Sequence, residues 1–465
     1  MKFNKALLMA AVVIGTTLTA CEKFLERPPQ GQLTKDEALK DEQGLINFVN
    51  GIYTYVGDAD FMGGRVSVLN DLLGDQFRGD RLTGDYAEIF KRQNSFFGGT
   101  RDALYTKGYR IIDRANVTLE NLNLATSQKS LLEGQARFFR GMAHFELVRL
   151  FAQPWGYTSD NSHPGIPLKD KSGAESVLRS SVKEVYDLII ADLKAADDLL
   201  PADAAGGKFY TATKWAAKAY LAKVYFQMND FANAYKYADE VIKSGKFQLD
   251  TDLNARYSSG LSKEGILVIA NNTTFYEPGA DLRGNYRSDR GIPTLNLTDA
   301  FYNYATAKAA DKRKAWYSNT LQPTYNVLTK YNKDNFDLPI VHLTEIKLIR
   351  AEAGAEIAGS NAAALATAIT DINDIMTRAY GSTAQNLPAT ATATGVINTV
   401  RAERELELIG EGNRINEIKR IGARNGTNID RRGSVWNCNG MILQFPKAEQ
   451  DANAAFKMNP EGGCF

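Results

Sequence analysis

The sequence predicts a mostly α-helical protein: a scaffold of tetratricopeptide-like helix pairs, with long irregular loops inserted between them and a few short strands. Apolar residues recur at helical spacing over much of the chain, which indicates amphipathic helices. In the pair at 213–244, Ala222, Tyr225 and Ala234 stand where a tetratricopeptide unit has its small residues and its tyrosine. Strand-like runs are few, and the best are 265–269 and 441–445. An irregular helical bundle is the alternative that fits the same periodicity.

The first 20 residues are typical of a bacterial lipoprotein signal peptide. Lys2 and Lys5 precede an apolar stretch at 6–18, which is shorter than the roughly 20 apolar residues that a spanning helix needs. The stretch ends in Leu18-Thr19-Ala20-Cys21, which resembles a lipobox. We expect cleavage before Cys21, acylation of this residue (palmitate among the acyl chains), and anchoring of the mature chain to a membrane. The alternative is an ordinary secretory signal beside an unrelated cysteine.

The mature chain is expected to begin with an extended tether at 21–33, because Pro28 and Pro29 disfavour a helix there. Helical patterns follow from Thr34 onwards, where an N-cap residue precedes an acidic first turn. We expect an N-terminal helical region at 34–245 and a C-terminal region at 246–465 that carries the ligand loops, packed together as one globular unit. The predicted helical segments are 34–53, 104–122, 132–150, 177–200, 213–228, 230–244, 339–357, 362–379 and 399–421, the last one broken at 410–412.

Long irregular stretches separate these helices, at 57–100, 153–176, 246–338 and 422–465. Loops of this length in a compact protein are usually functional or disordered. They carry many aromatic rings among Gly, Asn, Asp and Arg. This mixture suits a binding surface, because rings offer stacking faces and polar groups offer directional hydrogen bonds. For any single ring, packing against the helical scaffold is the simpler interpretation.

Composition excludes several classes of function. The 55 Lys and Arg against 54 Asp and Glu give a formal charge of +1, so no general basic field is present to hold nucleic acid. Three His and three Cys leave little material for zinc or iron–sulfur sites. The motifs of serine hydrolases, zinc proteases and phosphate-binding loops are absent from the sequence. The stretch 58–63 begins like a calcium loop, but Met62 replaces an oxygen ligand. We therefore predict no catalytic residue, no metal site and no cofactor.

A series of short motifs, in this order and at this spacing, resembles the SusD/RagB family of outer-membrane lipoproteins from Bacteroidota. The resemblance spans essentially the whole mature chain. It rests on Cys21 with Phe24 and Pro28, on Ala136–Arg140, on Pro154–Gly156 leading to Gly165–Leu168, on Thr213–Ala217 with Ala222–Tyr225, on Asp311–Arg313, on Arg404–Leu406, on Glu411–Arg414 and on Phe445-Pro446.

The resemblance implies a concrete function. Members of this family are non-enzymatic and cover a SusC-like TonB-dependent transporter as a hinged lid at the cell surface. They capture an oligosaccharide, or in some members a peptide, and help deliver it to the barrel. We therefore expect a glycan-binding lipoprotein of the outer membrane. The alternatives are a protein that binds peptides for import and, from a different class, a surface-anchored glycosidase.

The resemblance also implies where the ligand binds. In the family, ligand contacts come from regions that correspond to the loops 57–100 and 270–320 of this chain, while individual motif residues do not align. The segment 422–440 is the alternative location. The candidate ligand-binding residues are Asp75, Arg81, Phe96, Phe97, Tyr276, Asn285, Tyr286 and Trp436.

Two further expectations concern the C-terminal half. Cys438 and Cys464 are the only thiols that remain once Cys21 is acylated, so an exported chain is expected to join them in a disulfide, with two unpaired thiols as the alternative. Charges alternate around the helix break near 410. These residues are expected to tie helices together through ion pairs and not to contact the ligand: Arg404, Glu405, Glu411 and Arg414.

Overall fold

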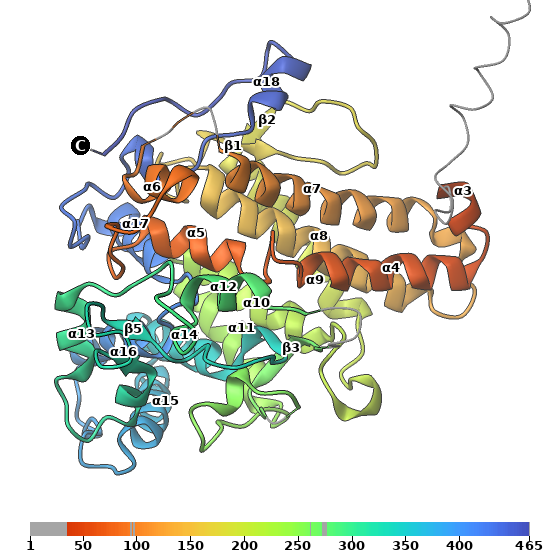
Figure 1. The fold of residues 1–465 in the computed structure, drawn as a ribbon. Helices are drawn as coiled ribbons and strands as arrows, with labels where there is room; N and C mark the ends of the chain where they lie inside the picture. Colours follow the sequence, from red (N-terminus) through yellow and green to blue (C-terminus); the bar gives the residue numbers. More distant parts are fainter. Residues whose placement is uncertain (1–34, 94, 96–97, 261, 272–276, 465) are drawn as a thin grey trace, which may run out of the picture.

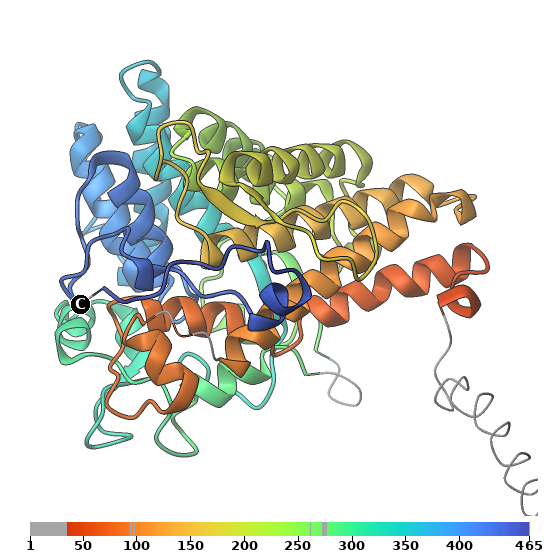
Figure 2. The same cartoon turned by 90° about the horizontal axis from the view of Figure 1, so that it is seen from above.

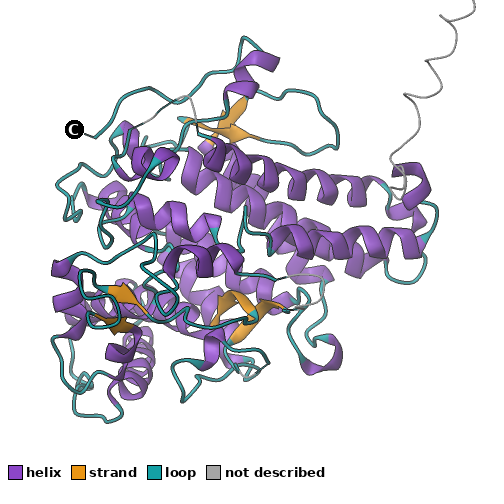
Figure 3. Ribbon diagram, in the orientation of Figure 1, coloured by secondary structure: helices purple, strands orange, loops and turns teal. Residues whose placement is uncertain are grey.

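The computed structural model describes residues 35–93, 95, 98–260, 262–271 and 277–464, and most of them are helical (Figure 1; Figure 3). The predicted mostly α-helical fold is confirmed. The α-helices are α3 (Lys35–Ala38), α4 (Glu42–Val56), α5 (Arg65–Leu73), α6 (Gly84–Phe90), α7 (Gly99–Glu120), α8 (Lys129–Phe151), α9 (Val182–Leu199), α10 (Lys214–Gln227), α11 (Phe231–Lys243), α12 (Ala280–Tyr286), α13 (Asp299–Thr306), α14 (Leu343–Glu356), α15 (Ala362–Tyr380), α16 (Ala393–Glu407), α17 (Arg414–Asn425) and α18 (Lys447–Ala452).

The helices pack in a continuous series, each against the next. Helix α8 lies between α7 and α9, α9 contacts α10, α10 pairs with α11, and α14 packs against α11, α15 and α16 (Figure 1; Figure 2). A stack of neighbouring helix pairs is the arrangement of tetratricopeptide-like scaffolds, in which each pair buries its apolar face against the next one. None of the helices in the described ranges is both long enough and apolar enough to cross a membrane.

Small residues allow the close helix contacts that the sequence predicted. Ala222 of α10 and Ala234 of α11 are fully buried, and the ring of Tyr225 lies parallel to that of Tyr237 with 5.7 Å between centroids. In α14, a Cβ atom on Gly354 would lie 2.8 Å from the carbonyl oxygen of Ala364 at the start of α15. Since this distance is below any normal contact, α14 and α15 can cross here only because a side chain is missing.

The strands form small antiparallel pairs at the edges of the helical scaffold (Figure 3). They are β1 (Pro164–Pro167) with β2 (Arg179–Ser181), β3 (Gly265–Ile269) with β6 (Leu338–His342), and β4 (Tyr317–Ser318) with β5 (Val327–Leu328). The strand expected at 265–269 is therefore present.

The strand predicted at 441–445 is wrong. A short 3₁₀ helix, Asn439–Met441, is followed by irregular backbone. The apolar residues of this run point into the core, where Phe445 packs 5.5 Å from Phe151. The Leu443 N–H donates to the carbonyl of Leu150 at the end of α8, so it is satisfied without a strand partner.

Three of the stretches predicted to be irregular contain helices. The stretch 57–100 contains α5 and α6, the stretch 246–338 contains α12 and α13, and the stretch 422–465 contains α18. Almost every side chain of α5 is buried, including the polar Asn70 and Asp71. A helix that is buried on all sides has no polar face, and so it lacks the amphipathic pattern on which the sequence prediction relied.

One contiguous apolar core joins the two regions expected from the sequence. It includes Leu104 and Phe139 from the N-terminal region and Ile346 and Ile415 from the C-terminal region. A smaller cluster lies between α14, α15 and α16. The core holds α5 and α12 rigidly, and these two helices position the loops described next.

Candidate ligand-binding surface

Three extended segments that are far apart in the sequence lie side by side beyond the end of α5. The Arg78 N–H donates to the carbonyl of Asn296 at 2.7 Å, and the Thr298 N–H donates to the carbonyl of Gln76 at 3.0 Å. On the other side, the Leu297 N–H donates to the carbonyl of Asn326 at 2.8 Å. We call the surface formed by residues 74–83, 287–298 and 318–326 the loop platform.

The alternation of side chains along an extended backbone gives the loop platform an apolar and a polar face. Phe77 and Leu297, which are bridge partners, are buried in the core. The ring of Phe77 packs 5.6 Å from that of Tyr286 on α12. The side chain of the next residue, Arg78, is partly exposed. The backbone bridges therefore keep the polar side chains on the outer face and the apolar ones in the core.

Guanidinium groups gather around a tyrosine on the polar face. The guanidinium carbons of Arg78 and Arg81 lie 5.5 Å and 5.4 Å from the ring centroid of Tyr325. Arg78 also donates two hydrogen bonds to Asp80, at 3.2 Å and 3.1 Å. Cation–π contacts of this kind hold long arginine side chains near an aromatic face at a partly exposed position.

Carboxylate, amide and apolar groups complete the surface. Asn326 donates to the exposed carboxylate of Asp299 at 2.7 Å. Gln322 donates to the carbonyl of Ser288 at 3.0 Å, which holds the second and third segments together. Ile292 and Leu321, one in each of these segments, are exposed. A polyhydroxylated ligand would therefore find donors, acceptors, an aromatic ring and apolar side chains within one surface.

Of the predicted ligand-binding residues, Arg81 is exposed on the loop platform, whereas Asp75 lies in its first segment with a buried side chain. Asp75 is 3% exposed and receives two hydrogen bonds from Arg414, both at 2.8 Å. Burial acts to raise the pKa of Asp75, but the hydrogen bonds and charge of Arg414 hold the pKa below its usual value. The structure does not place the Asp75 side chain on the ligand surface, because the carboxylate is already paired inside the protein.

The structure does not place the side chains of Tyr286 and Asn285 on the ligand surface either, because both are buried and hydrogen-bonded inside the protein. The side chain of Tyr286 is 0% exposed, and its hydroxyl donates to Asp71 at 2.6 Å. Asn285 is buried and donates to the carbonyl of Asp281 one helical turn before it. Both residues belong to α12, which supports the loop platform from below.

Four predicted residues remain, and the structure describes one of them, Trp436. Phe96, Phe97 and Tyr276 lie outside the described residues. Trp436 is half-buried and packs against Gly422 of α17, with its ring 6.2 Å from that of Tyr157. Trp436 therefore belongs to a separate aromatic contact near the C-terminus.

Sequence reasoning did not single out Tyr325, Asn326 or Asp299 as ligand-binding residues. Tyr325 stood out only as one of many rings in an irregular stretch. What distinguishes Tyr325 from the other rings is its contact with Arg81. Because the two residues are far apart in the sequence, no local pattern could have predicted this contact.

The four residues expected to tie helices together take part in ion pairs. Arg414 contacts both Asp75 and Glu405, and Glu411 accepts from His342 at 2.9 Å and from Arg256 at 3.3 Å. Arg404 is buried between Glu352 and Glu417, at 4.0 Å and 3.9 Å. Burial acts to raise the pKa of Glu411, but the charges of Lys330 and His342 hold the pKa well below its usual value.

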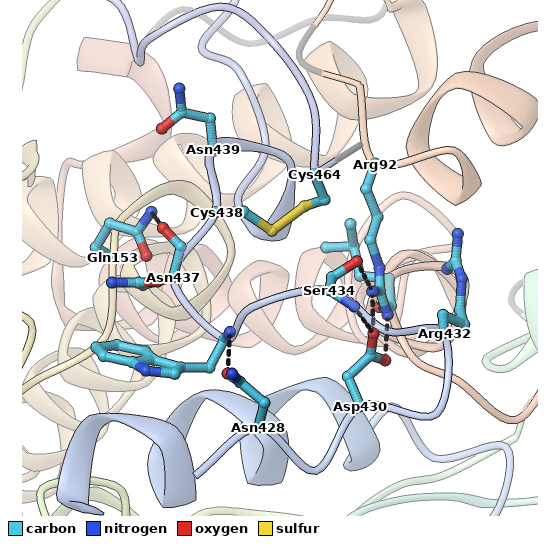
Figure 4. The surroundings of a disulfide bond; sticks show 12 residues. Arg92, Gln153, Asn428, Asp430, Arg432, Ser434, Asn437, Cys438, Asn439 and Cys464 are labelled. Atoms are coloured by element: carbon cyan, nitrogen blue, oxygen red, sulfur yellow. Dashed lines mark hydrogen bonds and ion pairs between the residues drawn. A yellow bond between two sulfur atoms is a disulfide. The ribbon is translucent and has the colours of Figure 1, made fainter. Parts of the chain in front are cut away.

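Figure 4 shows how the C-terminal segment is attached. Cys438 and Cys464 form a disulfide, with Cα atoms 5.2 Å apart. Next to it, Arg92 donates to both oxygens of the buried Asp430 at 2.7 Å and 2.8 Å, and to Ser434 at 2.8 Å. The hydrogen bonds of Arg92 hold the segment after α17 against the rest of the protein, and the disulfide joins two points within this segment. Within the described ranges, no group of His, Cys, Asp and Glu is arranged to hold a metal ion.

Comparison with known families agrees with this architecture. The model of the SusD family matches residues 192–461, which is more than half of the chain. The chain belongs to the SusD family. A second family model, described as "starch-binding associating with outer membrane", matches residues 23–226 of this SusD-family protein. The resemblance noted from the sequence motifs is thereby confirmed.

Curated relatives carry the same family name. The SusD-family chain is 29% identical over 272 residues to a SusD-like protein of Formosa agariphila, which covers 56% of this chain and 51% of the relative. It is 24% identical over 297 residues to a SusD-like protein of Bacteroides ovatus, covering 57% of this chain and 50% of that one. The chain thus spans about half the length of the curated relatives that it matches.

Solved structures show the same fold over nearly the whole chain. A SusD superfamily protein from Bacteroides thetaiotaomicron superimposes with a TM-score of 0.79 at 22% identity, covering 90% of this chain and 100% of the other. A putative sugar binding protein from Bacteroides vulgatus superimposes with a TM-score of 0.75 at 26% identity, covering 91% and 99%.

Proposed function

We propose that this protein is a glycan-binding lipoprotein of the cell surface that is attached to the outer membrane through an acylated Cys21. It captures oligosaccharides on the loop platform and passes them to a SusC-like TonB-dependent transporter. It binds its ligand without catalysing a reaction.

The observation that carries this proposal is the match of residues 23–226 to a family described as starch-binding and associated with the outer membrane. The loop platform supports it, because a rigid apolar base presents arginines, carboxylates and a tyrosine to solvent. Saccharides are commonly bound by such groups, since ring faces stack on aromatic side chains and hydroxyl groups exchange hydrogen bonds with charged ones.

The test is calorimetric titration of the mature protein with a panel of neutral oligosaccharides, followed by titration of Arg81→Ala and Tyr325→Ala with the best ligand. We expect each substitution to weaken binding by about 1–3 kcal/mol, as is common for anchor residues. Arg110→Ala and Tyr157→Ala are matched controls, because both side chains are exposed and lie outside the loop platform. The controls should bind like the parent protein.

Three results would overturn parts of the proposal. Turnover of the glycan would show a glycosidase. Binding of peptides but of no glycan would show the peptide-importing alternative. Parent-like affinity in both Arg81→Ala and Tyr325→Ala would show that the ligand binds elsewhere. Co-purification from membranes tests the association with the transporter. A TonB-dependent transporter should co-purify with the tagged protein.

A further inference from the structure

A pocket that shares no residue with the loop platform opens beside β3. Its volume is about 470 Å³, and residues of the loops 207–210, 246–248, 258–260 and 262–263 surround it together with parts of β3 and β6. In Figure 1, β3 lies to the right of β5, next to which the loop platform is built. None of the functions discussed above uses this pocket.

One buried carboxylate fixes the walls of the pocket. Asp337, just before β6, accepts from the Tyr210 hydroxyl and from the Gly260 N–H, both at 2.8 Å, and from the Asn271 N–H at 2.9 Å. The Val268 N–H donates to the carbonyl of Phe209 at 2.9 Å, which attaches the loop 207–210 to the edge of β3. The pocket is therefore built by tertiary hydrogen bonds and is not a gap between loose loops.

The charged side chains that line the pocket are mainly cationic. Lys208, Lys246 and Lys263 are exposed at its rim, and Arg256 is buried in its wall. Among the described residues of the lining, Asp337 alone carries a carboxylate, and its two oxygens already accept three hydrogen bonds. A concave surface with several positive groups and one occupied carboxylate attracts anions.

Within the described part of the chain, two of these four cationic groups are neutralised by carboxylates nearby and two are not. Lys246 pairs with Asp203 at 2.5 Å. In contrast, no carboxylate of the described residues lies within ion-pair distance of Lys208 or Lys263. Arg256 is balanced by Glu264 and Glu411 at 3.2 Å and 3.3 Å, but its Nε has no hydrogen-bond partner among the described residues.

Polar and aromatic groups add to the charge. Phe209 and Tyr210 are half-buried in one wall, and Phe209 packs 4.7 Å from Phe247 behind it. Gln248, Ser258 and Ser262 also face the cavity. These groups provide a ring face and hydrogen-bonding partners next to the lysines, as a saccharide that carries a negative charge would need.

We propose that this pocket binds an anionic saccharide, one that bears carboxylate or sulfate groups, at a site separate from the loop platform. The anionic part of this assignment rests on the pocket alone. The saccharide part rests on the proposed function. Lys208 and Lys263 bind the negative group, and the aromatic wall contacts the sugar ring.

The experiment is titration of the mature protein with four probes at low ionic strength: trigalacturonate, a sulfated disaccharide, inorganic sulfate and the neutral trisaccharide cellotriose. The double variant Lys208→Gln/Lys263→Gln removes the two unpaired charges. The matched control Lys183→Gln/Lys236→Gln changes two exposed lysines on α9 and α11. We expect the pocket variant to lose about tenfold or more in affinity for a charged saccharide, the control to lose less than about twofold, and added salt to weaken binding.

The outcomes separate the two proposals. Arg81→Ala/Tyr325→Ala should leave binding of the charged saccharide unchanged, so failure of the loop platform does not affect this result. The pocket assignment is overturned if no charged probe binds the parent, if the pocket variant binds like the parent, or if the control loses as much. Equal affinity for inorganic sulfate and the sulfated disaccharide would overturn the saccharide part. A preference between trigalacturonate and the sulfated disaccharide identifies the charged group.

Discussion

At the scale of single residues, the interior of this protein is unusually rich in charged and polar groups that are paired with one another. Arg92 with Asp430, Arg414 with Asp75, and Arg313 with Glu403 are all buried. Removing one partner of a buried pair leaves the other without compensation, so these positions are sensitive although they are far from any ligand. Two buried polar groups, Asp71 and Arg414, lead to predictions that denaturation can check.

Asp71 should make the stability depend on pH. Burial raises its pKa from 3.8 to about 7, although the Tyr286 hydroxyl acts in the opposite direction. The folded protein therefore keeps the proton to a higher pH than the unfolded chain does. The contribution of Asp71 to stability is complete below about pH 4 and is lost as the pH rises through 7.

The variant Asp71→Asn tests this dependence. The free energy of unfolding of the parent should fall between pH 4 and pH 7 more steeply than that of the variant, by up to about 1.4 kcal/mol per pH unit. Urea unfolding at several pH values measures the slope. Asp80→Asn, a change at a partly exposed carboxylate, is the control and should keep the slope of the parent. An unchanged slope in Asp71→Asn would contradict the prediction.

Arg414 should matter for stability and not for ligand affinity. Arg414→Ala leaves the buried Asp75 carboxylate without its main partner, and we expect a loss of about 3–5 kcal/mol in the free energy of unfolding. Arg431→Ala is the matched control, because Arg431 contacts Asp75 at 3.4 Å but its side chain is 41% exposed. An exposed pair contributes about 0–1 kcal/mol. Weaker ligand binding by the folded fraction of Arg414→Ala would show a role in the site.

At the scale of elements, short irregular segments are held in place by helices that periodicity did not reveal. Helix α5 is buried almost completely, and the loop platform begins directly after its last residue. Helix α12 contributes Tyr286, which packs against Phe77 of the platform and against Tyr331. The platform is rigid because its base belongs to the apolar core. The C-terminal segment is held to the body by the ion pair of Arg92 with Asp430, and a disulfide closes the segment on itself.

The disulfide should stabilise the segment after α17. Cys438 and Cys464 enclose a loop with a sequence separation of 26. In the chain-entropy model, such a cross-link contributes about 3–4 kcal/mol by restricting the unfolded chain. The double variant Cys438→Ser/Cys464→Ser should lose about this amount in chemical denaturation. Mass spectrometry without reductant should find no free thiol at these positions in the parent, and reductant should destabilise the parent but not the variant.

At the scale of the whole molecule, one core joins the N-terminal and C-terminal regions, so the protein presents its binding surfaces on a single helical body. The loop platform and the pocket beside β3 are formed by different segments of this body. Residues 1–34 precede the described part and contain the expected attachment site. We therefore expect the position of the protein in the cell to depend on Cys21, which lies outside the described residues.

Cys21→Ser should release the protein from membranes. Each buried methylene of a lipid chain contributes about 0.8 kcal/mol, so loss of all acyl chains removes the anchor entirely. Cell fractionation and incorporation of labelled fatty acid measure the effect. Cys438→Ser is the control, since it changes a cysteine that takes part in the disulfide, and it should remain membrane-bound and labelled. Membrane-bound, labelled Cys21→Ser would show that the lipid is attached elsewhere.

The sequence by itself determined the helical scaffold, the strand at 265–269 and the family, because helix periodicity and short motifs are local properties. The sequence also singled out Arg81, which lies exposed on the loop platform. Only the tertiary structure decided that Tyr286 and Asp75 are internal, that α5 is a helix, and that Tyr325 lies beside Arg81. The physical reason is that burial and pairing arise from contacts between distant segments. A tyrosine that meets a buried carboxylate and a tyrosine that meets two arginines at the surface have the same local pattern until the chain has folded.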